Sequence, residues 1–144
     1  MTETIVVGYD GSDSANRALD FAAALAKSSG ASITVAYVLE WSPYTFLTPE
    51  EIEERHARRT EELSRAESAV IAPVLKKLSR QGVTASAAIK YGHIAETIYK
   101  IAKDAGASQV VIGRTGHSSL STRLFGSVAG TLAQASPAPV TIVP

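Results

Sequence analysis

Short apolar runs rich in β-branched residues alternate along the whole chain with segments in which apolar residues recur every three or four positions. The short runs are typical of buried strands, and the spaced apolar residues are typical of amphipathic helices. We expect five strands, at Thr4–Tyr9, Ser32–Leu39, Val83–Ile89, Gln109–Ile112 and Val140–Val143. The third of these alternates small and apolar residues, which favours a place near a sheet edge.

Helices are expected between the strands, and polar or glycine residues mark their ends. Ser12 or Asp13 caps the first helix, because short oxygen-bearing side chains accept the free N–H groups of a first turn. Glycines after the apolar stripes end three helices, because glycine adopts the left-handed conformation of a helix C-terminus. These are Gly30, Gly82 and Gly106.

The second helix is predicted to be long, from Thr48-Pro49 to about Arg80. Thr48 caps it and Glu51 completes a capping box. Its first half, Glu50–Glu62, is charged and solvated. Pro73 is expected to kink the second half, because proline has no backbone N–H to donate to the helix. That half is predicted to bury Leu63, Ala66, Val70, Val74 and Leu78.

A strict alternation of strand and helix predicts an α/β fold with a doubly wound parallel sheet and helices on both faces. The chain contains no internal repeat, low-complexity segment or linker. Residues 1–144 are therefore predicted to form one Rossmann-like domain.

Composition narrows the class of protein. Lysine plus arginine and aspartate plus glutamate both number 14, and this zero net charge does not favour nucleic-acid binding. The absence of cysteine excludes disulfides and thiolate chemistry. No apolar stretch reaches the ~18 residues of a membrane span, and the N-terminus does not read as a signal peptide. We expect a cytoplasmic protein.

Candidate chemistry lies after the first and fourth strands, because ligands of doubly wound sheets bind beyond the carboxyl ends of the strands. The two loops are Gly8-Tyr9-Asp10-Gly11-Ser12 and Gly113-Arg114-Thr115-Gly116-His117-Ser118-Ser119. If the two strands are neighbours, the loops face one another.

The second loop begins the spaced pattern Gly113-x2-Gly116-x9-Gly126-Ser127. Glycines allow backbone N–H groups to approach an anion closely, and the N-terminus of a following helix adds partial positive charge. Arg114 offers charge close by. The pattern is neither a Walker loop nor the Gly-x-Gly-x-x-Gly dinucleotide fingerprint.

This pattern resembles the nucleotide-binding signature of the universal stress protein family. The opening Ile5–Ser12, the helix entry Gly92–Ile98 and the final Pro139–Pro144 are also similar to segments of that family. The resemblance covers the chain from end to end. Because all the glycines and the serine of the signature are present, the chain resembles the members that bind ATP.

The resemblance implies a five-stranded sheet of order 3-2-1-4-5 and a set of nucleotide contacts. It implies that Gly8 and Tyr9 line the base, Asp10 lies near the ribose or base, and Val38 flanks the adenine. For the ribose and phosphates it implies Ile112, Gly113, Gly116, Gly126, Ser127 and Val128. Tyr9 is a departure, because many binders have a proline there.

The same resemblance implies ATP, or AMP or cyclic AMP, as ligand, with Mg²⁺ entering only with the nucleotide. It also implies a homodimer that pairs through Val140–Val143. A regulatory role in stress is expected, with slow hydrolysis at most, because no clear general base faces the phosphates. No dedicated metal site is predicted, since no two histidines have ligand spacing. The aromatic loop Trp41–Phe46 is a candidate lid, partner surface or dimer contact.

Alternatives remain open for both residues and function. Asp10 also suits a helix cap or turn, and the glycines suit ordinary turns. The protein as a whole also fits a nucleotide-free dimeric interaction module. An adenine-nucleotide hydrolase is a third alternative. The pyrophosphate loop of such enzymes is only faintly similar to Gly8–Ser14, and the charge of Asp10 would disfavour a pyrophosphate there.

Overall fold

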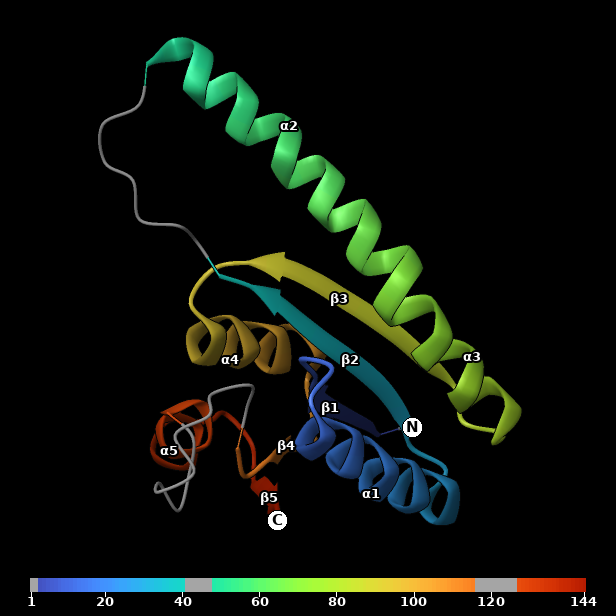
Figure 1. Cartoon of the computed structure of the whole chain (residues 1–144). Helices are drawn as coiled ribbons and strands as arrows, with labels where there is room; N and C mark the ends of the chain where they lie inside the picture. The colour runs from blue at the N-terminus through green and yellow to red at the C-terminus, as the bar shows by residue number, and fades with distance from the viewer. Residues whose placement is uncertain (1–2, 41–47, 116–126) are drawn as a thin grey trace.

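The computed structural model describes residues 3–40, 48–115 and 127–144. Within them, five parallel strands form one sheet of order β3-β2-β1-β4-β5 (Figure 1). The strands are β1 (Thr4–Gly8), β2 (Ser32–Leu39), β3 (Ala85–Tyr91), β4 (Gln109–Gly113) and β5 (Val140–Val143). The predicted fold class and strand order are confirmed, and β3 is an edge strand as expected.

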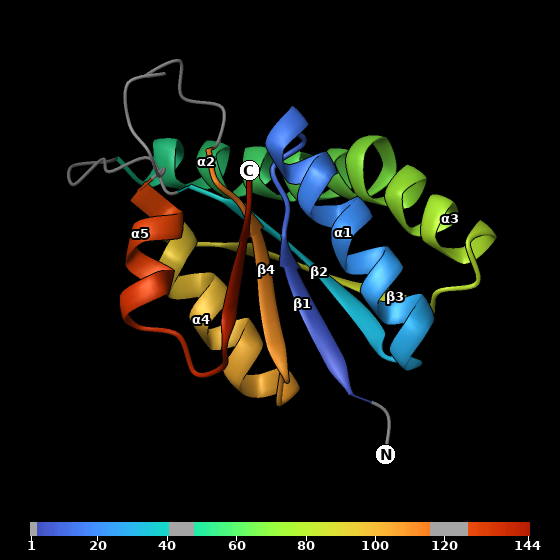
Figure 2. The same ribbon diagram turned by 90° about the horizontal axis from the view of Figure 1, so that it is seen from below.

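Two apolar cores lie on the two faces of this sheet (Figure 2). Helix α1 (Asp13–Ser29) covers one face together with the end of a long helical segment that precedes β3. Helices α4 (Ile94–Ala105) and α5 (Ser127–Gln134) cover the other. No helix in the described ranges has the length and hydropathy needed to cross a membrane.

Strand β1 lies at the centre of both cores. Ile5 and Val7 pack on the α1 side and Val6 packs on the α4 side, and all three side chains are at most 2% exposed. Parallel strands covered by helices on both faces are apolar throughout, which explains the continuous run in the sequence.

The helix ends follow the predicted capping residues. Ser12 caps α1, and its Oγ accepts a hydrogen bond from the N–H of Ala15 at 3.1 Å. Gly30 and Gly106 end α1 and α4 with φ values of 78° and 60°, in the left-handed region that favours glycine.

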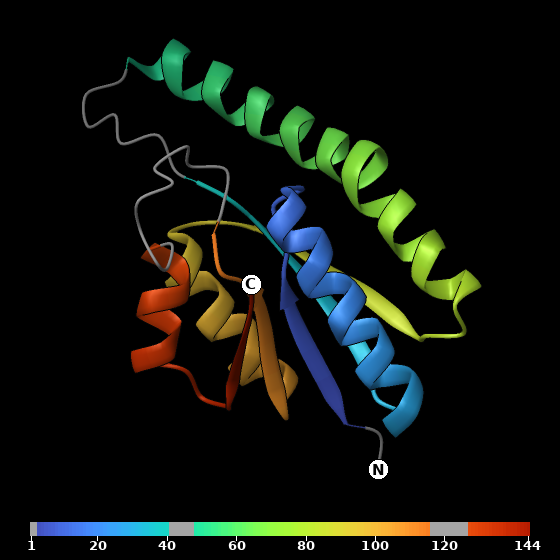
Figure 3. The ribbon, with the colours of Figure 1, turned by 60° about the horizontal axis from the view of Figure 1, so that its bottom comes forward.

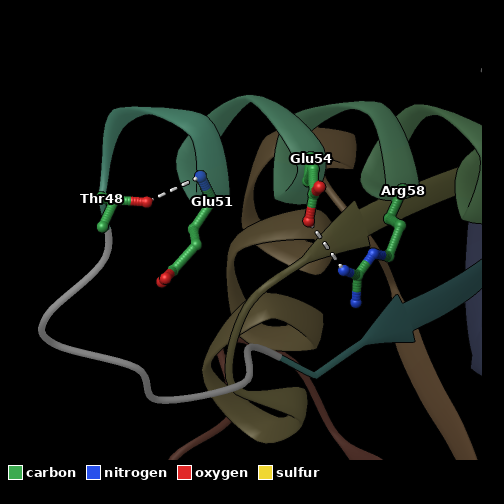
Figure 4. Close-up of polar contacts among 4 residues, drawn as sticks. All are labelled: Thr48, Glu51, Glu54 and Arg58. Atoms are coloured by element: carbon green, nitrogen blue, oxygen red, sulfur yellow. Dashed lines mark hydrogen bonds and ion pairs between the residues drawn. The ribbon is translucent and has the colours of Figure 1, made fainter.

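The long helical segment begins as predicted, with the Oγ1 of Thr48 accepting the N–H of Glu51 at 3.2 Å (Figure 4). Its first part, α2 (Pro49–Arg65), contains no buried residue and projects beyond the ends of β2 and β3 (Figure 1). An exposed ion pair between Glu54 and Arg58, 3.5 Å long, lies on its surface (Figure 4). Such pairs contribute little to stability, so α2 depends on contacts elsewhere.

One such contact is made by Tyr91 at the end of β3. Its hydroxyl donates a hydrogen bond to Glu62, and the guanidinium of Arg59 lies 4.7 Å from the centre of its ring. Burial raises the pKa of Tyr91 to about 12; the hydrogen bond and charge of Glu62 add to the rise and Arg59 opposes it. The carboxyl end of β3 is thereby joined to the last turns of α2.

The middle of the segment corrects the predicted core stripe. Residues Ala66–Ile71 form a π-helix, and the N–H of Ala72 bonds to the carbonyl of Glu67, five residues earlier. This wider turn places Ile71, 1% exposed, in the core where Val70 was expected, and Val70 is only half-buried. Pro73 follows directly; it lacks an N–H and its ring crowds the carbonyl four residues before it, which favours the wider turn.

The segment ends in a regular helix, α3 (Ala72–Arg80), which buries Val74 and Leu78 as predicted. Ala66 is also buried as predicted, whereas Leu63 is only half-buried.

The register of the π-helix is tested by two alanine substitutions. Ile71→Ala is expected to lower the free energy of unfolding by about 2–5 kcal/mol, because it leaves a cavity in the core. Val70→Ala is expected to lower it by about 1 kcal/mol, because its side chain is half solvated. Urea denaturation measures both, and a larger loss at Val70 would show that the regular helical stripe is present instead.

Candidate functional site

The carboxyl ends of β1 and β4 diverge, and this divergence creates the candidate site (Figure 3). The pairing between the two strands ends at Val7 opposite Val111. Beyond that point Gly8 lies opposite Ala36 of β2, and Gly113 lies opposite Val143 of β5.

Backbone hydrogen bonds continue this divergence into the loops. The N–H of Tyr9 donates to the carbonyl of Ala36 at 2.9 Å, and the N–H of Arg114 donates to the carbonyl of Val143 at 2.9 Å. A crevice between the two central strands is the place where doubly wound sheets bind ligands. The two predicted loops therefore leave the sheet on the two sides of this strand divergence, which we call the crevice.

Asp10 holds the start of α1. Its Oδ1 accepts hydrogen bonds from the N–H of Ser12 at 2.9 Å and from the Oγ of Ser12 at 2.5 Å. Ser12 in turn caps the helix. The structural alternative considered for Asp10 is therefore present, and its contact with a ribose or base stays a prediction.

The side chain of Tyr9 lies on the α1 face of the sheet. Its hydroxyl donates to the Oδ1 of Asn16 at 2.7 Å, and its ring packs against the core beneath α1. Burial raises the pKa of Tyr9 and the charge of Asp10 adds to this rise, while Lys77 opposes it. The hydroxyl is thus a neutral donor whose partner lies in the protein.

Four other predicted contacts gather on the opposite face. Val38, Ile112 and Val128 belong to the core beneath α4 and α5 or pack against it. A Cβ at Gly8 would lie 3.0 Å from Ile112 Cγ2 and 3.0 Å from Ile98 Cδ1, in the same core. The structure therefore brings Gly8, Val38, Ile112 and Val128 to one face and separates the ring of Tyr9 from them.

Gly113 is required by the packing of α1. A Cβ at this position would lie 2.3 Å from the Oγ of Ser14 and 2.8 and 2.9 Å from the backbone carbon and oxygen of Ser14. Real Cβ atoms do not approach backbone atoms so closely, so any side chain at Gly113 would push α1 away from β4. The first glycine of the signature thus has a structural role, whatever ligand contact its backbone makes.

Ser14 is the residue at this site that the sequence interpretation missed. It is 3% exposed, and its Oγ accepts a hydrogen bond from the N–H of Thr115 at 3.3 Å. The sequence did contain a signal for Ser14: the helical stripe places this polar residue in the core. A buried hydroxyl has a hydrogen-bond partner, so such a residue indicates a specific contact. Asn16, which accepts the hydroxyl of Tyr9, was also missed; it is only half-buried, so no such signal was available for it.

The remaining predicted residues lie at the entrance of the site or outside the described residues. Arg114 is exposed, and Ser127 is the exposed first residue of α5. Gly116, Gly126 and the Trp41–Phe46 loop lie outside the described ranges. Among residues 3–40, 48–115 and 127–144, no group of three or more histidine, aspartate and glutamate side chains is placed to hold a metal ion.

A cavity of about 590 Å³ lies away from the crevice, between the end of β3 and the outer side of α4. Its lining carries both charges, with Lys90 and Lys100 beside Glu96 and Asp104. Because β3 is two strands away from β1, this cavity is separate from the loops discussed above. Neither strand divergence nor a glycine-rich loop marks it, so we place the candidate site at the crevice.

Comparison with known proteins gives one consistent family. The model of the universal stress protein family matches residues 1–144. The universal stress protein YxiE of Bacillus subtilis is 32% identical over 152 residues, which cover 99% of each chain.

Solved structures agree with this match. The universal stress protein UspA of Lactobacillus plantarum superposes with a TM-score of 0.85 at 24% identity, covering 99% of this chain and 97% of that one. A universal stress protein solved in complex with cAMP has a TM-score of 0.67 at 28% identity, with 99% and 97% covered.

The packing role of Gly113 is tested against a glycine that has free space. Gly113→Ala is expected to lower the free energy of unfolding by about 1–3 kcal/mol, because α1 and β4 must separate. Gly130→Ala, where a Cβ in α5 meets nothing within 4 Å, is expected to raise it by about 0.5–1 kcal/mol through helix propensity. Thermal and urea unfolding compare the two, and equal effects would contradict the assigned contact.

Proposed function

We propose that this chain, which belongs to the universal stress protein family, binds an adenine nucleotide in the crevice between β1 and β4. ATP is the proposed preferred ligand. The bound nucleotide sets a regulatory state of the protein in a stress response, with little or no hydrolysis.

The divergence of β1 and β4 beyond Val7 and Val111 is the observation that carries this proposal. It lies at the switch point of the sheet, where the chain changes from winding toward β2 and β3 to winding toward β5. Doubly wound sheets bind their ligands at this position. Gly8 ends β1 and packs against Ile112 of β4, since a Cβ at Gly8 would lie 3.0 Å from Ile112 Cγ2. The flat face of a base or the ribose is proposed to lie beyond this small and apolar pair.

Relatives support the choice of an adenine nucleotide. The family structure that is 28% identical to this chain was solved with cAMP. Two further structures of the same fold, from Archaeoglobus fulgidus and Arabidopsis thaliana, contain dAMP and AMP. Adenine, a furanose sugar and one phosphate group are common to all three ligands.

The preference for ATP is proposed from the signature Gly113-x2-Gly116-x9-Gly126-Ser127. Ser127 is the first residue of α5, and the partial positive charge at the start of this helix favours a phosphate beside it. A triphosphate is proposed to contact the signature along its whole length. Mg²⁺ is proposed to bind only through the nucleotide.

Slow hydrolysis is proposed from the structural role of the carboxylate at the crevice. Asp10 accepts two hydrogen bonds from Ser12 through Oδ1, so this oxygen serves to hold the start of α1. A hydrolytic water needs a group that positions it and accepts its proton. We propose that the site holds its nucleotide and that exchange, rather than turnover, changes its state.

A homodimer through Val140–Val143 is the proposed assembly. β5 forms one edge of the described sheet, and its four residues are only half-buried. An edge strand with free backbone groups pairs readily with a second copy of itself. The same edge would serve a nucleotide-free interaction module, so dimerisation alone does not separate the two functions.

Nucleotide binding is therefore the decisive measurement. Mass spectrometry of the small molecules released from freshly purified protein, followed by calorimetric titration of ATP, AMP and cyclic AMP, is expected to give tight binding of ATP. Gly116→Val is expected to abolish this binding while the fold survives, because its side chain would occupy the proposed phosphate position.

Gly130→Ala is the matched control and is expected to bind as the parent does, since Gly130 faces open space on α5. If no adenine nucleotide bound to the parent protein, the interaction module would replace this proposal. If Gly116→Val bound ATP as tightly as the parent, the assignment of the phosphates to the signature would be wrong. Rapid release of phosphate from bound ATP would instead support the hydrolase.

A further inference from the structure

We infer that Ser14 is a positioning residue, which fixes the beginning of the β4–α5 loop against α1 and thereby sets the affinity of the crevice for the phosphates of its ligand. The inference rests on the proposed nucleotide site. It concerns a residue that acts through Thr115 and has no predicted contact with the nucleotide.

The need for such a residue arises from the strand divergence. Beyond Val7 and Val111, one side of the crevice is hydrogen-bonded to β2 and the other to β5. Direct pairing between β1 and β4 no longer holds the two loops together there. Their separation must be set by something that bridges from one side to the other.

Helix α1 provides that bridge, because it starts on the β1 side and packs against β4 (Figure 3). The hydroxyl of Ser14 accepts the N–H of Thr115, and Gly113 lets the two backbones approach. A second bond, from Arg17 Nε to the carbonyl of Pro144 at 3.1 Å, is exposed to water. Water competes with the exposed bond, whereas Ser14 is shielded, so Ser14 is the stronger constraint.

The position of this bond connects it to the phosphates. Thr115 directly precedes Gly116, and one residue of chain spans at most about 3.6 Å. The bond therefore holds the last described residue before the rest of the signature. The N–H of Thr115 is used within the protein, so it is not itself the donor for a phosphate. A loop that is held before the ligand arrives loses less entropy when it binds.

Ser14→Ala tests the inference, with Ser28→Ala as control. Ser28 lies on the same helix but is exposed and bonds only to the nearby carbonyl of Leu25. Ser14→Ala is expected to weaken ATP binding roughly three- to tenfold, the equivalent of one lost hydrogen bond. AMP is expected to be weakened less, because it has fewer phosphates, and Ser28→Ala is expected to change neither.

Amide hydrogen exchange at Thr115, measured by NMR without nucleotide, is the second readout. It is expected to accelerate in Ser14→Ala and to stay unchanged in Ser28→Ala, with circular dichroism confirming that both fold. Unchanged exchange at Thr115, or equal losses for ATP and AMP, would overturn the role of Ser14 while leaving the nucleotide site in place. A parent protein that binds neither nucleotide would overturn the proposed function and this inference together.

Discussion

The separation of β1 from β4 after Val7 and Val111 is the feature on which the rest of the site depends. It follows from the winding of the chain: β1 is followed by the half of the sheet that contains β2 and β3, and β4 by the half that contains β5. Each strand end keeps its hydrogen bonds with its own half. The crevice is thus a consequence of topology, and side chains decide only how wide it is and what it binds.

The contact of Ser14 with Gly113 shows how the fold sets that width. A glycine in a signature is readily assigned to a ligand, but the space where its Cβ would be is filled here by α1. The same residue therefore determines how closely α1 approaches β4, and through Thr115 how the following loop begins. The contact between Ser14 and Gly113 therefore serves both folding and binding. A side chain at Gly113 is expected to lower the free energy of unfolding even where it touches no ligand.

The positions of the strands and the ends of the helices were predictable because local rules and tertiary packing agree there. The apolar runs gave the strands, and Gly30 and Gly106 gave two helix ends. The order of the strands came from the resemblance to the family, which the long spaced signature identified. The π-helix was not predicted, because Val70 and Ile71 are both apolar and a regular helical stripe selects Val70. The wider turn before Pro73 places Ile71 in the core instead. The sequence interpretation assigned no direction to the ring of Tyr9. Strand alternation places this ring beside Ile5 and Val7, on the face away from Val38.

The stability of the molecule is distributed unequally between the crevice and α2. The strands and helices that surround the crevice contribute the buried cores, whereas α2 contributes no buried residue. A helix of 17 residues is marginally stable in water by itself, and Tyr91 joins this one to the sheet through exposed contacts with Arg59 and Glu62. Local opening of α2 would therefore cost far less free energy than opening of the crevice. The buried residues of this long segment lie in the π-helix and α3, so the core that supports Ser14 and Thr115 contains no residue of α2.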